Sequence, residues 1–248
     1  MPIRAAVMDW NGTLIEFPDE GRLWKHVGVG LLREAVKHRR PLRTAGLLWA
    51  MRKLRRLTEQ YRAGRIDYGA IYDVFNPSVL RGVPVATVDR LTQEYAEKPE
   101  TGIALNHDLL ATVAGPVDIK IILSTGYRDG IRRVLRNRGY ESVPTRIEAN
   151  DLVVDSEERV DYFNHRRINK GQFLPGLLTE EEIDGQDTVY IGDRADDEGC
   201  FDIVAYPVLS HHATPTYRSQ FQRRYPRGFV LEATGASYRD FDNFLRKN

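Results

Sequence analysis

The sequence predicts an α/β fold in which helices cover both faces of a doubly wound parallel sheet. Short apolar runs of strand length alternate along the chain with segments of helical periodicity, and several runs are bounded by Gly, Asp or Pro. With 248 residues, 42% of them hydrophobic and 29% charged, the chain is long enough to bury a large core. The predicted strands span residues 3–8, 118–124, 145–149, 188–192 and 203–209.

A helix is predicted directly after the second strand. Ile131, Val134 and Leu135 recur there at helical spacing, and Gly139 is placed to end the helix as a C-terminal cap. This alternation of strands and helices indicates a sheet that is covered on both faces.

The stretch from about Glu20 to Glu97 contains almost no strand signal. One helix is predicted behind Thr44 as its N-cap, and others are expected around residues 68–80 and 88–96. We therefore expect a helical insert, residues 18–98, in a core domain formed by residues 1–17 and 99–248. The helix after Thr44 has apolar residues at three- and four-residue spacing: Leu47, Leu48, Met51, Leu54, Leu57 and Tyr61. Breaks between the helices are predicted near Pro41, Pro77, Pro84 and Pro99.

Charge is distributed unevenly, although the net charge is only +1. Residues 22–65 hold thirteen Lys and Arg against two Glu, and residues 141–202 hold seventeen acids against six bases. Either the two regions have different tasks, or they face each other across a cleft. The alternative for each run is a solvated surface.

Cys200 is the only cysteine, so there is no internal disulfide framework, and we expect it to be a small buried apolar residue. The N-terminal apolar run, Ala5 to Met8, is too short for a signal peptide. No apolar run approaches the roughly 18 residues that a membrane span needs. We therefore expect a cytoplasmic protein.

Polar residues that suit phosphate chemistry follow the predicted strands. The carboxyl ends of parallel strands meet at one edge of a sheet, where helix N-termini gather positive potential. The set offers a carboxylate nucleophile, acidic ligands for a hard cation, and hydroxyl, amide and ammonium groups for a phosphoryl group. Its members are Asp9, Asn11 and Thr13; Ser124, Thr125 and Gly126; Lys170; and Asp193, Asp196 and Asp197.

The chain contains, in this order, Asp-x-x-Gly-Thr, a strand-ending Ser or Thr, a Lys and Gly-Asp-x-x-x-Asp. This ordered set resembles the four motifs of the haloacid dehalogenase-like (HAD) hydrolases. The chain is most similar to the phosphoserine-phosphatase-like branch, which has a helical cap between its first two motifs. Residues 146–163, a strand leading into a hairpin, also fit that branch. The resemblance covers nearly the whole chain and implies a Rossmann-like HAD core with an inserted cap.

The resemblance implies that Asp9 attacks phosphorus and becomes an aspartyl phosphate. It also implies a Mg²⁺ held by the carboxylates of Asp9 and Asp193 and the backbone carbonyl of Asn11, with Asp197 supporting a metal-bound water. Asp196 is the rival of Asp197, but the four-residue step from Asp193 fits the family spacing better.

The phosphoryl group is implied to lie against Ser124 and the amides around Thr125 and Gly126. Thr125 is the rival of Ser124, which alternatively only caps the following helix. Lys170 would neutralise the charge shared by phosphate and Asp9, although Arg166 and Arg167 are near neighbours. His211 and His212 are interpreted as loop residues rather than ligands.

Asn11 departs from the family pattern, which usually has a second aspartate there as general acid and base. An amide does not exchange protons near neutral pH, so turnover should be slower by about 10² to 10⁴. The function predicted is a Mg²⁺-dependent phosphatase of atypical chemistry. The alternatives are a slow phosphoryl carrier, or a non-catalytic protein that binds a phosphorylated ligand or an anionic surface. An engineered Asp-to-Asn change and deamidation of Asn11 are further explanations.

Substrate choice is expected to lie in the cap. We expect a small phosphorylated substrate. Because the insert is basic, a phospholipid head group or an anionic membrane is a further candidate target, with Leu47, Leu48, Trp49 and Met51 available to an interface. The alternative is that this apolar face packs against other cap helices. No nucleic-acid-binding motif accompanies the Arg clusters near Trp24, Trp49 and Tyr61, so no specific nucleic acid is expected.

Overall fold

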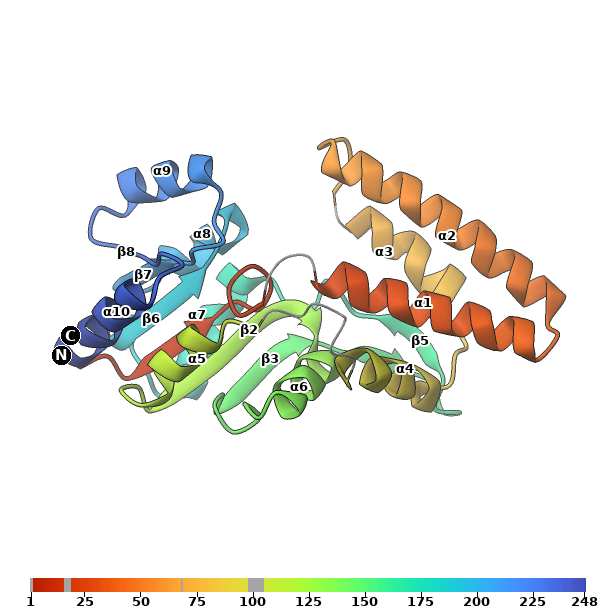
Figure 1. Ribbon diagram of the computed structural model, residues 1–248, viewed down its shortest axis with the longest axis horizontal. Coiled ribbons are helices and arrows are strands. Elements are labelled where there is room, and N and C mark those ends of the chain that lie inside the picture. The colour runs from red at the N-terminus through yellow and green to blue at the C-terminus, as the bar shows by residue number, and fades with distance from the viewer. Residues whose placement is uncertain (1, 16–18, 68, 98–104) are drawn as a thin grey trace.

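The computed structural model describes residues 2–15, 19–67, 69–97 and 105–248 (Figure 1). Its main sheet has six parallel strands in the order β3-β2-β1-β6-β7-β8, so β1 lies in the interior of the sheet. This order confirms the doubly wound α/β fold. The strands are β1 (Ala5–Met8), β2 (Ile119–Tyr127), β3 (Arg146–Asn150), β6 (Thr188–Gly192), β7 (Tyr206–Leu209) and β8 (Phe229–Val230).

Alternate residues of the strands pack into two different cores. Ala6 and Met8 of β1 contact the cluster that contains α5, α6 and α10, whereas Ala5 and Val7 contact the cluster that contains α7, α8 and α9. A strand covered on both faces must be apolar at every position, and all four residues of β1 are fully buried. The helices are α5 (His107–Ala114), α6 (Arg128–Asn137), α7 (Lys170–Glu180), α8 (Glu198–Phe201), α9 (Pro215–Arg224) and α10 (Gly235–Lys247).

Helix α6 ends as predicted. Gly139 has φ +76°, its N–H donates to Arg136 O, and the Tyr140 N–H donates to Leu135 O. This is the glycine-terminated hydrogen-bond pattern that satisfies the last carbonyls of a helix. Strand β2 is longer than predicted, and its pairing with β3 is irregular between Leu123 and Tyr127.

Four helices and a π-helical turn are described between β1 and α5, and we call them the insert helices. They are α1 (Asp19–Lys37), α2 (Pro41–Arg62), α3 (Gly69–Phe75), the π-helical turn η1 (Asn76–Leu80) and α4 (Val85–Glu97). Figure 1 shows them beside the C-terminal end of β2. The predicted domain boundaries at 17/18 and 98/99 lie outside the described residues, and so does Pro99.

Two details of the insert correct the sequence predictions. Thr44 is not an N-cap, because α2 already begins at Pro41 and the Thr44 hydroxyl donates to Arg40 O. Proline has a fixed φ that suits the first helical position, so it starts the helix one turn earlier. Pro77 does not break the chain between helices, because it lies at the start of η1, which continues directly from α3.

An antiparallel hairpin of β4 (Leu152–Val154) and β5 (Val160–Phe163) follows β3, as predicted. It holds the insert helices: the Asn76 amide donates to Phe163 O at 3.1 Å, and the Phe163 N–H donates to Asn76 Oδ1 at 3.0 Å. Trp24 of α1 packs against Phe75, Tyr127 and Phe163, with ring centroids 5.1–5.5 Å apart. This aromatic cluster joins α1, α3, β2 and β5. Within the described ranges, no helix combines the length and apolar character needed to span a bilayer.

Candidate active site

Asp9 directly follows β1 and is buried, with 1% of its surface exposed. Its N–H donates to Ile191 O of the neighbouring strand β6, and its Oδ1 accepts from the Trp10 N–H at 2.7 Å. The chain then turns tightly, with the Leu14 and Ile15 N–H groups donating to Trp10 O. This turn fixes the carboxylate at the end of the strand.

Gly12 allows the turn to approach the opposite acidic loop. Its φ is +77°, and a Cβ at this position would lie 2.2 Å from Asp193 Oδ2. Both the backbone conformation and the space therefore require glycine here.

Lys170 is the first residue of α7 and reaches two carboxylates at once. Its Nζ lies 2.7 Å from Asp9 Oδ1 and 2.8 Å from Asp197 Oδ1, and its side chain is only 6% exposed. Burial alone would lower the pKa of Lys170, but the charges and hydrogen bonds of Asp197 and Asp9 raise it above its usual range. Lys170 therefore remains a cation between the two acids.

Asp197 has both oxygens engaged. Oδ1 accepts from Lys170 and from the Tyr190 hydroxyl at 2.8 Å, and Oδ2 accepts from the Asp193 N–H at 3.0 Å. Burial would raise the pKa of Asp197, but the charge and hydrogen bond of Lys170 and the donors Tyr190 and Asp193 lower it. This residue is therefore an ionised group that orients Lys170 and the loop of Asp193.

Three acids converge in a way that suits a cation. Asp9, Asp193 and Asp197 can each present a carboxylate oxygen so that all three atoms lie within 4.8 Å of one another. Asp9 Oδ2 and the amide oxygen Asn11 Oδ1 are buried and accept no hydrogen bond from the described residues. Desolvated oxygens without donors are an unfavourable arrangement unless a cation compensates them, so these residues fit a Mg²⁺.

Burial perturbs the two acids that face this space. It raises the pKa of Asp9 to about 6, although Lys170 opposes the shift, and it raises the pKa of Asp193 to about 7 with a further contribution from Asp9. Arg194 Nε lies 3.4 Å from Asp193 Oδ1 and lowers the pKa of both acids. A divalent cation would favour the ionised forms.

Ser124 is fully buried in β2, and its Oγ accepts from the Gly126 N–H at 2.9 Å. It does not cap α6, whose N-cap is Tyr127 without a side-chain hydrogen bond. Thr125, the rival residue, is exposed, and its carbonyl accepts from the Asn150 amide at 2.7 Å. Of the two hydroxyls, Ser124 is thus the buried one, and the irregular pairing of β2 surrounds it.

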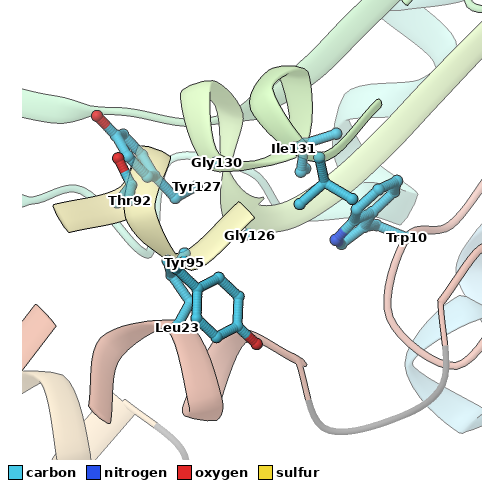
Figure 2. A pocket seen from close by; sticks show the side chains of 9 residues that line it. Trp10, Leu23, Thr92, Tyr95, Gly126, Tyr127, Gly130 and Ile131 are labelled. Carbon is cyan, nitrogen blue, oxygen red and sulfur yellow. The ribbon is translucent and has the colours of Figure 1, made fainter. Parts of the chain in front are cut away.

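A small cavity borders the loops of Asp9 and Ser124. Its volume of about 10 Å³ is close to the minimum for one water molecule. Figure 2 shows Trp10 and Ile131 on the core side and Leu23 and Tyr95 on the side of the insert helices. The walls are mostly apolar and come from both parts of the chain.

Residues 6–202 match the family model for haloacid dehalogenase-like hydrolases. The chain belongs to this family. Among curated proteins, none matches it.

Several solved structures share the fold at low identity. A protein of unknown function from Bordetella pertussis Tohama I has a TM-score of 0.64 at 14% identity, covering 94% of this chain and 99% of that one. A HAD family hydrolase from Salmonella enterica serovar Typhi has a TM-score of 0.60 at 16% identity, covering 94% and 68%. A substrate-bound phosphoserine phosphatase has a TM-score of 0.55 at 15% identity, covering 89% and 91%. The predicted HAD enzyme fold is thus confirmed, and phosphoserine phosphatases are among the neighbours.

The other candidates are not among the three acids that converge. The Asp196 side chain is 79% exposed, and Arg166 and Arg167 are exposed and pair with Asp73 and Asp151. His211 lies 2.9 Å from the Tyr238 hydroxyl. Cys200 is buried, as predicted.

Sequence reasoning missed three residues of the candidate site. Tyr190 lies inside β6, where an aromatic residue is typical of the core. Nothing in the sequence therefore distinguishes it from the other buried residues of the strand. Trp10 stands between Asp9 and Asn11, and its place in the motif could have marked it as a lining residue. Arg194 lies inside the Gly-Asp-x-x-x-Asp motif. A basic residue between the acids of this motif could have been recognised from the sequence as part of the candidate site.

Proposed function

We propose that this HAD protein is a Mg²⁺-dependent phosphatase that hydrolyses a small phosphomonoester through a phosphorylated Asp9. The observation that carries the proposal is the convergence of Asp9, Asp193 and Asp197 at the strand ends, with Lys170 bridging two of them. A nucleophilic carboxylate, a fixed cation and a group of desolvated acids are the parts that phosphoryl transfer needs.

In the first step, an Asp9 oxygen attacks phosphorus. The bond from phosphorus to the leaving oxygen breaks, and that oxygen keeps the electron pair and takes up a proton. Lys170 holds Asp9 Oδ1 in place and offsets the negative charge that the incoming phosphate brings. In the second step, water adds to phosphorus, the bond to Asp9 breaks, and the proton lost by water balances the one taken up earlier.

The phosphoryl oxygens are proposed to lie against Ser124 and the backbone around Thr125 and Gly126. Because Ser124 Oγ accepts from Gly126, its own hydrogen is available to donate. A buried donor of this kind is preorganised, so it needs no rearrangement when charge develops.

Mg²⁺ is proposed to bind Asp9, Asp193 and the backbone carbonyl of Asn11. When bound, it would reduce the repulsion between the Asp9 carboxylate and a phosphate dianion. Asp197 would act indirectly, since its own oxygens already accept hydrogen bonds from Lys170, Tyr190 and Asp193.

Asn11 makes slow turnover part of the proposal. It stands where the family pattern has a proton-exchanging aspartate, and an amide cannot take a proton from the attacking water. The second step should therefore limit the rate. For this reason a slow phosphoryl carrier, which passes the group from Asp9 to an acceptor, is the second candidate function.

We also propose that residues 18–98 form a cap over the site of a cytoplasmic enzyme. Supporting this, Leu23 of α1 and Tyr95 of α4 line the cavity that borders Gly126. Substrate would enter between the insert helices and the core, where closure excludes water.

The test is Mg²⁺-dependent release of phosphate from p-nitrophenyl phosphate and a panel of phosphomonoesters. Release should require Mg²⁺ and disappear in Asp9→Asn. The matched control is Asp196→Asn, which changes an exposed acid of the same region and should leave release nearly unchanged. Release that persists in Asp9→Asn would overturn the assignment of the nucleophile.

A further inference from the structure

Exposed apolar side chains are concentrated between the end of α1 and the first half of α2. Six large apolar side chains are exposed in the described part of the chain, and four of them lie between positions 36 and 49. Leu42 is 89% exposed and Trp49 is 57% exposed. These four residues are Val36, Leu42, Leu48 and Trp49.

This exposure is not a failure of α2 to pack. Leu47 and Ala50 on the opposite face are buried in the core of the insert helices, and Leu54 packs against that core. The expectation that Leu47 is available to an interface is therefore wrong. Leu42 and Trp49 are seven residues apart, so they share the outer face of the helix. Figure 1 shows α2 as the outermost of the insert helices.

The same surface is strongly basic. Residues 35–58 contain eight Lys and Arg and no Asp or Glu. Seven of the eight are exposed: Lys37, Arg39, Arg40, Arg52, Lys53, Arg55 and Arg56. Arg55 pairs with Glu59 at 3.3 Å, and no other ion pair between described residues engages these seven. Lys53 lies over the Trp49 ring, 5.0 Å from its centroid.

We infer that this basic apolar face of α2 docks the protein on an anionic lipid bilayer. Leucine and tryptophan side chains enter the boundary between head groups and acyl chains, while lysine and arginine extend from the helix to the anionic head groups. The inference stands apart from the chemistry of Asp9, because none of these residues belongs to the proposed active site.

Two other occupants fit the surface less well. A second copy would bring seven exposed bases against seven more, with Glu34 and Glu59 the nearest acids in the sequence, so the two faces would repel each other. Nucleic acid would satisfy the bases, but contacts to a phosphate backbone give no role to exposed leucines such as Leu42. Of these three occupants, the bilayer is the one that uses the apolar and the basic residues together.

The fold offers a built-in probe for the test. The other two tryptophans, Trp10 and Trp24, are 3% and 5% exposed, so a change in tryptophan emission on binding reports mainly Trp49. The full chain is mixed with vesicles of phosphatidylcholine alone or with added phosphatidylserine, and both co-sedimentation and emission are followed. We expect binding and a blue shift only with phosphatidylserine, and both should weaken as salt increases.

Variants separate the two contributions. Trp49→Ala should reduce vesicle binding by about tenfold or more, because it removes a large apolar contact. Arg52→Gln with Arg56→Gln should reduce it by about 25-fold, since each base contributes about fivefold near an anionic surface. Tyr162→Ala is the matched control, because Tyr162 is an exposed aromatic of the β4–β5 hairpin and its loss should leave binding unchanged.

Several outcomes would overturn the inference. The first is absence of vesicle binding at low salt by wild-type protein whose thermal unfolding is normal. The others are binding that Trp49→Ala and Tyr162→Ala weaken equally, and binding to single-stranded RNA with none to anionic vesicles. A concentration-dependent dimer that shields Trp49 from an aqueous quencher would assign the face to a second copy instead.

Discussion

Lys170 Nζ lies 2.7 Å from Asp9 Oδ1, and both side chains are buried. The same ammonium group lies 2.8 Å from Asp197 Oδ1, so one cation serves two acids that come from different loops. A buried charge is stable only with partners, and removing one partner leaves the others uncompensated. This bridge therefore connects the stability of the core to the chemistry proposed for Asp9.

Lys170→Met should destabilise the protein strongly, by about 3–5 kcal/mol near pH 8. The loss should be smaller at pH 5, because protonation of Asp9 and Asp193 then relieves part of the uncompensated charge. Thermal unfolding at both pH values measures the difference. Lys25→Met, at an exposed lysine, is the control and should change little. An equal loss at the two pH values would contradict the electrostatic explanation.

Mg²⁺ should stabilise the protein more at pH 7.5 than at pH 5. Burial raises the pKa of Asp9 to about 6 and that of Asp193 to about 7, both above the ordinary value of 3.8. At pH values between the ordinary pKa and the raised pKa values, the metal-free native state therefore binds more protons than the unfolded state. The stability that comes from the two groups is fully present below about pH 4 and is lost as pH rises through 6 and 7.

The measurement for this prediction is thermal unfolding with Mg²⁺ or with EDTA across that range. Mg²⁺ needs ionised ligands, so its stabilising effect should grow as Asp9 and Asp193 lose their protons. An effect of Mg²⁺ that is independent of pH would mean that these acids do not bind the ion.

Gly12→Ala should abolish the stabilising effect of Mg²⁺, because its Cβ would lie 2.2 Å from Asp193 Oδ2. Gly139→Ala is the matched control: Gly139 has nearly the same φ, +76°, but no atom within 4 Å of the added Cβ. The control should cost about 1 kcal/mol from backbone strain alone and leave the Mg²⁺ effect intact. If both variants respond to Mg²⁺ like wild type, the contact between Gly12 and Asp193 is not part of a metal site.

Tyr190→Phe should destabilise the protein by about 1–3 kcal/mol, because Asp197 loses a buried hydrogen bond to a charged group. Activity should fall as well, since Asp197 would hold Lys170 and the Asp193 loop less firmly. Tyr162→Phe, at an exposed tyrosine, is the control for both denaturant unfolding and phosphate release. Unchanged stability in Tyr190→Phe would mean that the hydroxyl of Tyr190 does not stabilise Asp197.

The fold was largely predictable, because a parallel sheet covered on both faces imposes short apolar runs. Strands β1 and β6 are buried at every position. Strand β8 was not predicted, since Phe229 and Val230 are too few residues to show a period. The start of α2 was misplaced because Thr44 and Pro41 both suit a helix N-terminus, and local sequence does not rank them.

The candidate site was predictable where residues stand at strand ends, and not where packing alone brings them in. Asp9, Asp193, Asp197 and Lys170 lie together as their motifs implied. Tyr190 points from the middle of a strand, so its bond to Asp197 depends on the three-dimensional turn of the following loop. The exposure of Leu42 and Trp49 likewise depends on which face of α2 packs inward.

Intact-protein mass spectrometry with peptide mapping shows whether Asp9 becomes phosphorylated. The protein is mixed with Mg²⁺ and p-nitrophenyl phosphate and quenched in acid at short times, beside Asn11→Asp. We predict that the wild-type protein carries a phosphoryl group on Asp9, because Asn11 cannot activate water. Asn11→Asp should release phosphate about 10² to 10⁴ times faster and carry less of the label. An unlabelled Asp9 in a protein that releases no phosphate, with or without the Asn11 change, would mean that Asp9 is not a nucleophile for phosphate esters.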